Sequence, residues 1–307
     1  MFSRMAYAFI LNPSANRTRA ESAESWLQLM IDKYWPGSRI YVTSSKSDIQ
    51  IKVQEAAKSF EVIVACGGDG TVNEVFSQVV KLLPSNPNLV LSVLPMGSGN
   101  DFAKSVHFST NPQVAIEQLK SAFVHHIDFV VYSSNHGNGY MFNTMNIGLG
   151  GQINFEASKV KKLKGPLIYI YSALKSVFNV VSADVDLIID GNHSYENMVM
   201  LTIANGSIEG GNFKVAPMAT NDDGVLDVVT VAPLPVWKLL PLLPLFLLGR
   251  QRWSKAVKFR KCRSLILESS LPIPLHVDGE QCGLEVTNLK VEIRKGELRV
   301  LSPTPGN

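Results

Sequence analysis

The sequence predicts two domains: an N-terminal α/β domain built on a doubly wound sheet, and a C-terminal β-rich domain folded as an antiparallel sandwich. The chain has 307 residues, which is room for about two domains of ordinary size. Residues 1–128 alternate strand patterns with helical patterns, the order typical of a doubly wound sheet. Residues 129–295 instead contain short apolar runs separated by turn residues, which is typical of antiparallel sheets.

The first domain alternates from its first apolar run onward. Apolar runs predict strands at Tyr7–Leu11, Arg39–Thr43, Val62–Cys66 and Val90–Leu94. Helical spacing predicts helices at Arg19–Lys33, Ile49–Ser59, Thr71–Leu83 and Asn111–Ala122. We also consider a return of the C-terminal end, about residues 296–303, to this domain.

The second domain is predicted from its apolar runs and turns. The runs are Tyr140–Ile147, Ser182–Ile189, Asn197–Ala204, Val225–Val231, Ser264–Glu268, Leu275–Asp278 and Leu289–Arg294. Asp-Gly pairs at residues 190–191, 223–224 and 278–279 favour tight turns. Lys159–Val180 is the one clear helical insertion. We expect the functional site in the cleft between the two domains.

Composition excludes several classes of protein. The net charge of +3 arises from 29 basic and 26 acidic residues, so charge gives no indication of a nucleic-acid partner. The three cysteines are too few and too widely spaced for a disulfide framework or a cysteine zinc site, which favours a reducing, cytoplasmic compartment. The histidines show no spacing typical of catalytic zinc.

One segment combines apolar and basic residues. Trp237–Leu248 is strongly apolar, but its 12 residues are interrupted by Pro241 and Pro244 and are too few to span a bilayer. Arg250–Arg263 follows with seven basic residues and no acidic one. This pattern is typical of interfacial helices, which predicts peripheral contact with the inner membrane surface. The alternative is a buried helix with a solvated basic face.

Two glycine-rich loops each follow a predicted strand and precede a predicted helix. They are residues 67–74 (GGDGTVNE) and residues 94–103 (LPMGSGNDFA). Glycines at such positions let backbone N–H groups approach phosphate oxygens, at the edge where open α/β sheets bind ligands. Neither loop is a Rossmann or Walker motif, because Asn73 and Ala103 stand where those motifs need glycine. Asp69 would repel a phosphate unless a metal lay between them, which favours Mg²⁺. An isolated acidic turn with a helix cap is the alternative interpretation.

Other motifs accompany these loops in a fixed order. They are Asn12-Pro13-Ser14, Asn143 followed by residues 148–152 (GLGGQ), residues 222–227 (DDGVLD) and residues 276–280 (HVDGE). The set resembles the diacylglycerol-kinase catalytic family, and the bacterial soluble lipid kinases fit best. The resemblance covers nearly the whole chain and implies an NAD kinase/diacylglycerol kinase-like fold, with nucleotide binding in residues 1–128 and lipid binding in residues 129–295. The GGDGT segment alone also occurs in NAD kinases.

The resemblance also implies roles for individual residues. The nucleotide would contact Asn12, Pro13, Ser14, Ala15, Asn16, Thr43, Gly68, Asp69, Gly70, Thr71, Val72, Asn73, Glu74 and Ser98. Asp69, Asp101 and Asp128 would organise catalytic Mg²⁺ and water, and Glu280 would take the proton of the lipid hydroxyl. The family's structural loop would bind Mg²⁺ or Ca²⁺ through Thr220, Asp223 and Val225. Plain turns are the alternatives at Asp223 and Glu280, and a strand-end cap is the alternative at Asp128.

The leading hypothesis is therefore an ATP- and Mg²⁺-dependent lipid kinase of phospholipid biosynthesis. Diacylglycerol is the expected acceptor, with sphingoid bases and phosphatidylglycerol left open. A soluble NAD kinase-like enzyme and a catalytically silent regulator that binds lipid or nucleotide are the alternatives. Relatives form dimers, so a homodimer is also considered.

Overall fold

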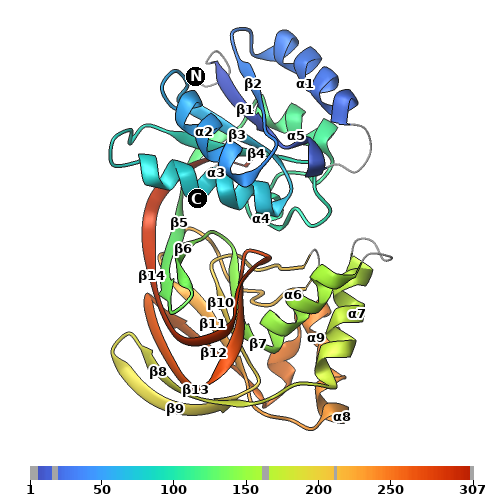
Figure 1. Cartoon of the computed structure of the whole chain (residues 1–307), viewed down its shortest axis with the longest axis vertical. Coiled ribbons are helices and arrows are strands. Elements are labelled where there is room, and N and C mark those ends of the chain that lie inside the picture. Colours follow the sequence, from blue (N-terminus) through green and yellow to red (C-terminus); the bar gives the residue numbers. More distant parts are fainter. Residues whose placement is uncertain (1–5, 16–19, 161–165, 211–212, 305–307) are drawn as a thin grey trace. The chain divides into compact units, whose positions relative to one another are not determined.

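The computed structural model describes residues 6–15, 20–160, 166–210 and 213–304. The chain divides into two compact units (Figure 1). The first comprises residues 1–127 and 296–307, and the second comprises residues 128–295. Two long strands contribute residues to both: β5 (Phe123–Ser134) and β14 (Glu280–Ser302). Each unit is described separately below.

The first unit is built on a parallel sheet. Its strands are β1 (Tyr7–Leu11), β2 (Arg39–Val42), β3 (Val62–Gly67) and β4 (Val90–Pro95), in the order β2-β1-β3-β4. The end of β14 adds a parallel pairing to β4 at Val300 and Leu91. Every residue of β1, β3 and β4 is buried, as expected for a sheet covered on both faces. The chain order reverses between β1 and β3, and ligands of doubly wound sheets bind beyond the strand ends at such a point.

Helices connect these strands. They are η2 (Pro13–Ala15), α1 (Ala20–Tyr34), α2 (Lys46–Ala56), α3 (Asp69–Leu82), α4 (Asp101–Ser105) and α5 (Pro112–Leu119). Helix α2 begins three residues before the predicted start because Ser45 Oγ accepts a hydrogen bond from the Asp48 N–H and caps the helix. Helix α3 begins at Asp69, inside the glycine run, with Gly68 in the cap position. The second glycine of GGDG therefore already belongs to a helix N-terminus.

The second unit is an antiparallel β structure. Its further strands are β6 (Gly137–Met141), β7 (Thr144–Gly148), β8 (Ala183–Ile189), β9 (Asn192–Met198), β10 (Met200–Ala204), β11 (Leu226–Val231), β12 (Val257–Cys262) and β13 (Ser264–Val277). Their order is β12-β11-β10-β7-β13-β14. Strand β8 also pairs with β13 and forms a hairpin with β9 (yellow in Figure 1). This arrangement confirms the predicted fold class of an α/β domain followed by a β sandwich.

Two predicted elements of the second unit are wrong in their extent. Instead of one helix at Lys159–Val180, the described part of this region has α6 (Leu149–Lys159) and α7 (Pro166–Val177). Gly148 of GLGGQ ends β7, and Gly150 and Gly151 lie in α6. This helix packs closely, because a Cβ at Gly151 would lie 2.4 Å from the Pro274 carbonyl oxygen. The predicted run Tyr140–Ile147 is divided between β6 and β7 by residues 142–143, whose backbone N–H groups bond to Asp278.

The basic segment is not the helix that its pattern predicted. The apolar part folds into α8 (Val236–Leu239) and α9 (Leu242–Leu248), but Arg250–Arg263 contributes only the short η3 (Gln251–Trp253) and then strand β12. Residues 257–262 pair with β11, so sheet pairing overrides the local pattern. Across the described ranges, every helix is too short or too polar to cross a membrane.

Candidate functional site

The two glycine loops meet backbone to backbone in the first unit. A Cβ in place of Gly97 would lie 2.5 Å from the Cα of Gly68, and one in place of Gly68 would lie 3.3 Å from the Cα of Gly97. Any larger residue at Gly97 would therefore force the loops apart. Both loops lie at the carboxyl ends of adjacent parallel strands, β3 and β4, as the sequence predicts. Contact between the loops therefore requires glycine at position 97 and leaves little room for a Cβ at position 68.

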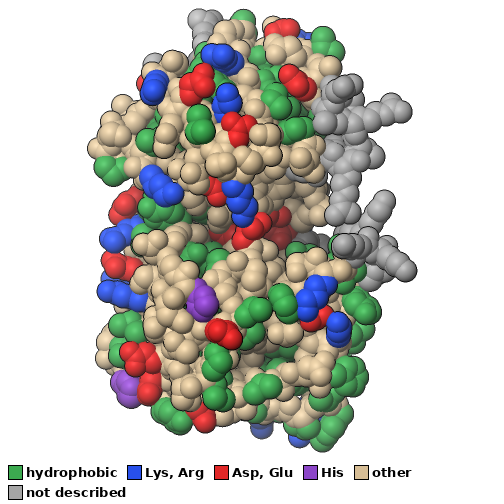
Figure 2. All heavy atoms as spheres, in the orientation of Figure 1, with side chains coloured by type: hydrophobic (Ala, Val, Ile, Leu, Met, Phe, Trp, Pro, Cys, Tyr) green, Lys and Arg blue, Asp and Glu red, His purple; other side chains and the backbone are tan. Residues whose placement is uncertain are grey.

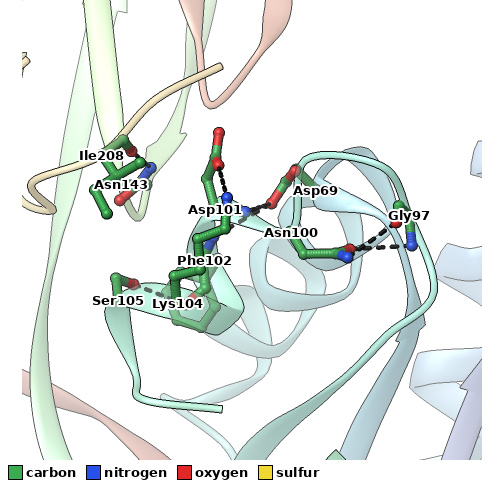
Figure 3. A network of polar contacts seen from close by, with 9 residues as sticks. All are labelled: Asp69, Gly97, Asn100, Asp101, Phe102, Lys104, Ser105, Asn143 and Ile208. Carbon is green, nitrogen blue, oxygen red and sulfur yellow. Dashed lines mark hydrogen bonds and ion pairs between the residues drawn. The ribbon is translucent and has the colours of Figure 1, made fainter. Parts of the chain in front are cut away.

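Asp69 joins the first loop to the helix that follows the second. Its Oδ1 atom accepts hydrogen bonds from the Asp101 N–H (2.7 Å) and the Phe102 N–H (3.2 Å), the first residues of α4 (Figure 3). The carboxylate thus caps a helix that lies 32 residues further along the chain. Burial, and after it the negative charge of Asp101, raise the pKa of Asp69 to about 6, although these backbone hydrogen bonds act in the opposite direction.

The second loop is closed by Asn100. Its side chain accepts from the Gly97 N–H (3.0 Å) and donates to the Gly97 carbonyl oxygen (2.9 Å), as drawn in Figure 3. Asn100 adopts the left-handed conformation (φ 53°), which Asn tolerates better than most residues. Asp101 then begins α4, and its Oδ1 lies 3.0 Å from Lys104 Nζ. The loop is therefore held in one shape, with Ser98 exposed.

The other residues predicted to contact a nucleotide surround the same strand ends. Asn12 follows β1, and its side chain donates to Thr71 Oγ1 (2.9 Å) on α3. Thr43 is buried and its hydroxyl donates to the Leu11 carbonyl oxygen, so its side chain closes the end of β1. The half-exposed residues are Asn12, Pro13, Gly68, Asp69, Gly70, Asn73 and Glu74, whereas Ser14 is exposed and Thr71 and Val72 are buried. Ala15 ends η2, and Asn16 lies outside the described residues.

The carboxylates of Asp69 and Asp101 fit a divalent cation. Both lie beside Gly99: a Cβ there would be 2.7 Å from Asp69 Oδ2 and 3.8 Å from Asp101 Oδ2. Mg²⁺ in phosphoryl-transfer sites is commonly held by one or two carboxylates together with waters and phosphate oxygens. In the described part of the chain no three acidic, histidine or cysteine side chains gather as metal ligands. Asp69 and Asp101 would supply two carboxylates to such a cation.

Asp128 is fully buried in the second unit. Its Oδ2 accepts a hydrogen bond from the Gly224 N–H (2.6 Å), and its own N–H donates to the Asn221 carbonyl oxygen (2.6 Å). Asn205 donates to the Asp128 carbonyl oxygen (2.9 Å). Asp128 thus fastens the turn that precedes β11. These contacts give Asp128 a structural role in the second unit. Its catalytic role remains a prediction.

The predicted structural metal loop carries its own counter-charge. Asp223 Oδ2 lies 2.9 Å from Lys261 Nζ, and its Oδ1 accepts from the Val225 N–H (3.2 Å). Lys261 Nζ also lies 3.6 Å from Oδ2 of the buried Asp227. The hydrogen bond to Asp223 raises the pKa of Lys261 and so favours its charged form. The predicted ligands Thr220, Asp223 and Val225 include one carboxylate, and the Lys261 ammonium group is already paired with it. With Lys261 in this position, the three residues do not fit a metal ion.

Glu280 lies half-buried at the start of β14, after a two-residue turn. Asp278 (φ 48°) and Gly279 (φ 84°) form that turn, which needs positive φ at both positions. The Asp278 carboxylate accepts hydrogen bonds from three successive backbone N–H groups, at residues 142, 143 and 144 (2.8–2.9 Å). Asn154 donates to the Gly279 carbonyl oxygen (2.8 Å). The turn that carries Glu280 is therefore anchored on both sides.

Sequence reasoning missed the residues that hold this turn. Asp278 was named only as part of an Asp-Gly pair and of the HVDGE motif, without a role of its own, and Asn154 was not singled out. Asn143, a motif residue without an assigned role, donates to the Ile208 carbonyl oxygen (2.8 Å; Figure 3), and its own carbonyl accepts from the N–H groups of Asn205 and Gly206. The GLGGQ motif, which begins five residues later, indicates that this region packs closely.

Comparisons with known proteins show which families this chain matches. Residues 6–132 match the family model of the diacylglycerol kinase catalytic domain, and residues 143–302 match that of the YegS C-terminal NAD kinase beta sandwich-like domain. Among curated relatives, the diacylglycerol kinase of Staphylococcus saprophyticus is 25% identical over 279 residues, covering 89% of this chain and 88% of its own. That of Staphylococcus carnosus is 25% identical over 276 residues, with the same coverage.

Two solved structures show the same fold. The structure of a diacylglycerol kinase from Bacillus anthracis matches with a TM-score of 0.72 at 20% identity and covers 96% of both chains. Yeast NADH kinase, solved with NADH, matches with a TM-score of 0.51 at 12% identity and covers 99% of this chain and 85% of its own. At these identities the likeness concerns the fold.

Proposed function

Since the chain belongs to the diacylglycerol kinase family, with its catalytic domain joined to a YegS-type β-sandwich domain, we propose that it transfers the γ-phosphate of ATP to a hydroxyl of diacylglycerol or a related lipid, with Mg²⁺. The observation that carries this proposal is the packing of the two glycine loops, which brings Asp69 and Asp101 together at the ends of β3 and β4. Backbone N–H groups and a carboxylate pair in one place suit a nucleotide phosphate bound through a cation.

In this proposal each part of the first unit has a defined task. The glycine loops let the nucleotide phosphates approach the backbone, and the N-terminus of α3 adds its partial positive charge. Asp69 and Asp101 would hold Mg²⁺, which would neutralise charge on the transferred phosphoryl group. Asn12 and Thr71, joined by their hydrogen bond, keep the end of β1 beside the start of α3. Positioning and charge supply most of the catalysis in phosphoryl transfer.

Glu280 is the proposed acceptor of the lipid hydroxyl proton. A general base must keep a set position within hydrogen-bonding reach of the attacking oxygen. Asp278 and Asn154 supply that constraint by fastening the turn. The carboxylate would accept the proton as the hydroxyl oxygen attacks the γ-phosphorus and ADP leaves.

The second unit also offers a surface suited to lipid membranes. Four residues of α7 and its end recur at helical spacing and are exposed: Leu167 (60%), Tyr171 (50%), Leu174 (43%) and Phe178 (65%). Trp237, Leu248 and Trp253 are likewise exposed around α8, α9 and η3. Figure 2 shows hydrophobic side chains gathered on the edge of the molecule where Figure 1 places α7 and α8. Exposed Arg250, Arg252 and Lys255 beside Trp253 would favour anionic lipid.

The test is transfer of label from γ-labelled ATP with Mg²⁺ to a panel of acceptors. Diacylglycerol, phosphatidylglycerol, sphingosine and monoacylglycerol are presented in mixed micelles, and NAD in solution. Wild type should label one lipid. Glu280→Gln should lower the rate by about 10²–10⁴-fold, and the matched control Glu268→Gln, at an exposed position of β13, should leave it unchanged. Label found in NAD alone would overturn the proposal. So would the absence of label from every acceptor when the protein is folded and binds nucleotide.

A further inference from the structure

Lys261 lies opposite a buried carboxylate in the second unit. The pairing of β11 with β12 places it directly across from Asp227, whose side chain is only 4% exposed. Oδ2 of Asp227 has no hydrogen-bond partner in the described part of the chain, and Lys261 Nζ lies 3.6 Å from it. Burial raises the pKa of Asp227, and the positive charge of Lys261 acts in the opposite direction. The lysine therefore supplies positive charge to a carboxylate that the fold has removed from water.

The same ammonium group reaches the turn that leads into β11. Its Nζ atom lies 2.9 Å from Asp223 Oδ2, so one positive charge bridges Asp223 and Asp227. The other oxygen of Asp223 accepts a hydrogen bond from the Val225 N–H (3.2 Å), which binds this carboxylate to the turn itself. Two carboxylates that converge on one positive charge are typical of Mg²⁺ and Ca²⁺ sites. Here that charge belongs to a side chain of the protein.

The turn that contains Asp223 also holds Asp128. The Gly224 N–H donates to Asp128 Oδ2, and the Asp128 N–H donates to the Asn221 carbonyl oxygen (both 2.6 Å). Asp128 is completely buried, so these backbone groups help to fix the position of its carboxylate. Contacts therefore run without a gap from Lys261 through Asp223 and Gly224 to Asp128. The lysine can act on Asp128 without touching it.

We propose that Lys261 replaces a structural cation in the second unit. Its ammonium group bridges Asp223 and Asp227 and fixes the turn at residues 221–224. By fixing this turn, Lys261 positions Asp128. The family resemblance predicts a divalent metal in this loop, whereas this chain supplies the positive charge from its own side chain. The turn should therefore stay formed when divalent cations are removed. The inference rests on the proposed function only where it gives Asp128 a part in phosphoryl transfer.

Hydrogen exchange at individual amides tests this inference. In wild type the amides of Gly224 and Asp128 should be protected equally with and without EDTA. Lys261→Ala should speed exchange at both by about tenfold or more, because the turn loses its charge partner and opens locally. The Asp278 amide, which donates to the Thr144 carbonyl oxygen (2.8 Å), is the internal reference and should keep its rate. Unchanged protection in Lys261→Ala, or protection that wild type loses in EDTA, would overturn the inference.

Two further variants separate this effect from a general loss of folding. Lys290→Ala, at an exposed position of β14, is the matched control and should leave exchange at every amide unchanged. If Lys261→Ala alone does not fold, adding Asp227→Asn removes the buried charge that has lost its lysine. This double variant should fold and still leave the Gly224 amide about tenfold less protected than in wild type. Protection equal to that of wild type would show that Lys261 does not hold the turn.

Added amines test whether the ammonium group itself is responsible. Propylammonium has the head group of lysine and would lie beside Asp223 and Asp227 in the space that Lys261→Ala opens. It should restore protection of the Gly224 amide in this variant by about threefold or more. Tetramethylammonium, which has the same charge but no N–H donor, should not restore it. Wild type should respond to neither compound. The absence of rescue by propylammonium would assign the effect to the lysine stem and overturn the inference.

Phosphoryl transfer supplies a separate test of the link to Asp128. In the labelled-ATP assay, Lys261→Ala should lower kcat about tenfold and leave the KM for ATP unchanged, because a displaced Asp128 slows the reaction while the glycine loops are unaltered. Propylammonium should recover part of this loss, and Lys290→Ala should match wild type. An unchanged kcat in Lys261→Ala would refute the positioning of Asp128. No transfer by wild type would refute the proposed function instead, and the exchange measurements would still decide the role of Lys261.

Discussion

Asp69→Asn should make the protein more stable at neutral pH while abolishing activity. The replacement keeps a side-chain oxygen that can accept hydrogen bonds from the Asp101 and Phe102 N–H groups, so α4 keeps its cap. It removes a negative charge that is partly buried and lies near the charge of Asp101. The negative charge of Asp69 would thus favour binding of a cation but lowers the stability of the fold without one.

The magnitude follows from the pKa. The pKa of Asp69 is about 6 in the folded protein against an ordinary value of 3.8. The folded state therefore binds the proton more tightly than the unfolded state, and stability falls as pH rises through the interval from about 4 to about 6. The full loss above that interval is about 3 kcal/mol. Asp69→Asn lacks this loss, so its advantage should grow from below about 1 kcal/mol near pH 4 to about 3 kcal/mol at pH 7.

The assay is urea unfolding of wild type and variant at a series of pH values. Tryptophan fluorescence reports on the first unit, because Trp35 is buried there against Tyr7 whereas Trp237 and Trp253 are already exposed. Asp32→Asn, at an exposed position of α1, is the control and should shift the unfolding free energy by less than about 0.5 kcal/mol at every pH. A variant that is less stable than wild type at pH 7, or a difference that does not depend on pH, would refute the reasoning.

Three further predictions concern the second unit. Asp278→Ala should lower the unfolding free energy by about 2–4 kcal/mol, because three backbone N–H groups lose their acceptor; equal stability would show that water replaces the carboxylate. In the Asp69→Asn background, excess Ca²⁺ should leave the melting temperature unchanged, because Lys261 pairs with Asp223. Adding Lys261→Met should lower the melting temperature and make it respond to Ca²⁺. A calcium response before the lysine is removed would contradict the conclusion that the Asp223 loop does not fit a metal ion. Arg250→Ala should weaken binding to anionic vesicles about fivefold in a sedimentation assay, with Lys58→Ala as an unaffected control; equal binding would exclude this surface.

Much of the fold and part of the site could be predicted because their signals are local. A buried apolar run followed by glycines and a helical pattern indicates a strand, a loop and a helix without knowledge of the rest of the chain. The same order of signals placed both glycine loops at strand ends, where the structure has them. Tertiary pairing could not be predicted: Arg250–Arg263 has the composition of a basic helix, but its second half joins β11 as strand β12.

The contacts that decide the chemistry of the site are long-range. Asp69 caps α4 across 32 residues, and Lys261 reaches Asp223 across 38. A motif shows that a carboxylate is present and does not show which distant group neutralises it. Asp223 and Asp69 occupy similar acidic turns in the sequence, yet one has a lysine partner and the other has a second carboxylate nearby. The sequence therefore predicted metals at both sites, and the structure shows that the two carboxylates have different neighbours.

This difference between the two acidic turns bears on function. Where a carboxylate already has an ammonium partner, a cation would have to displace it, and the gain in free energy would be small. Where two carboxylates are partly buried side by side, their charges destabilise the fold in the absence of a cation. Binding of a cation then recovers the free energy of folding that these charges cost. Asp101 also has an ammonium partner, Lys104, so the unfavourable charge is that of Asp69. The charge of Asp69 is thus an argument for the proposed Mg²⁺ and phosphate site at the glycine loops, and the Lys261 partner is an argument against a cation at Asp223.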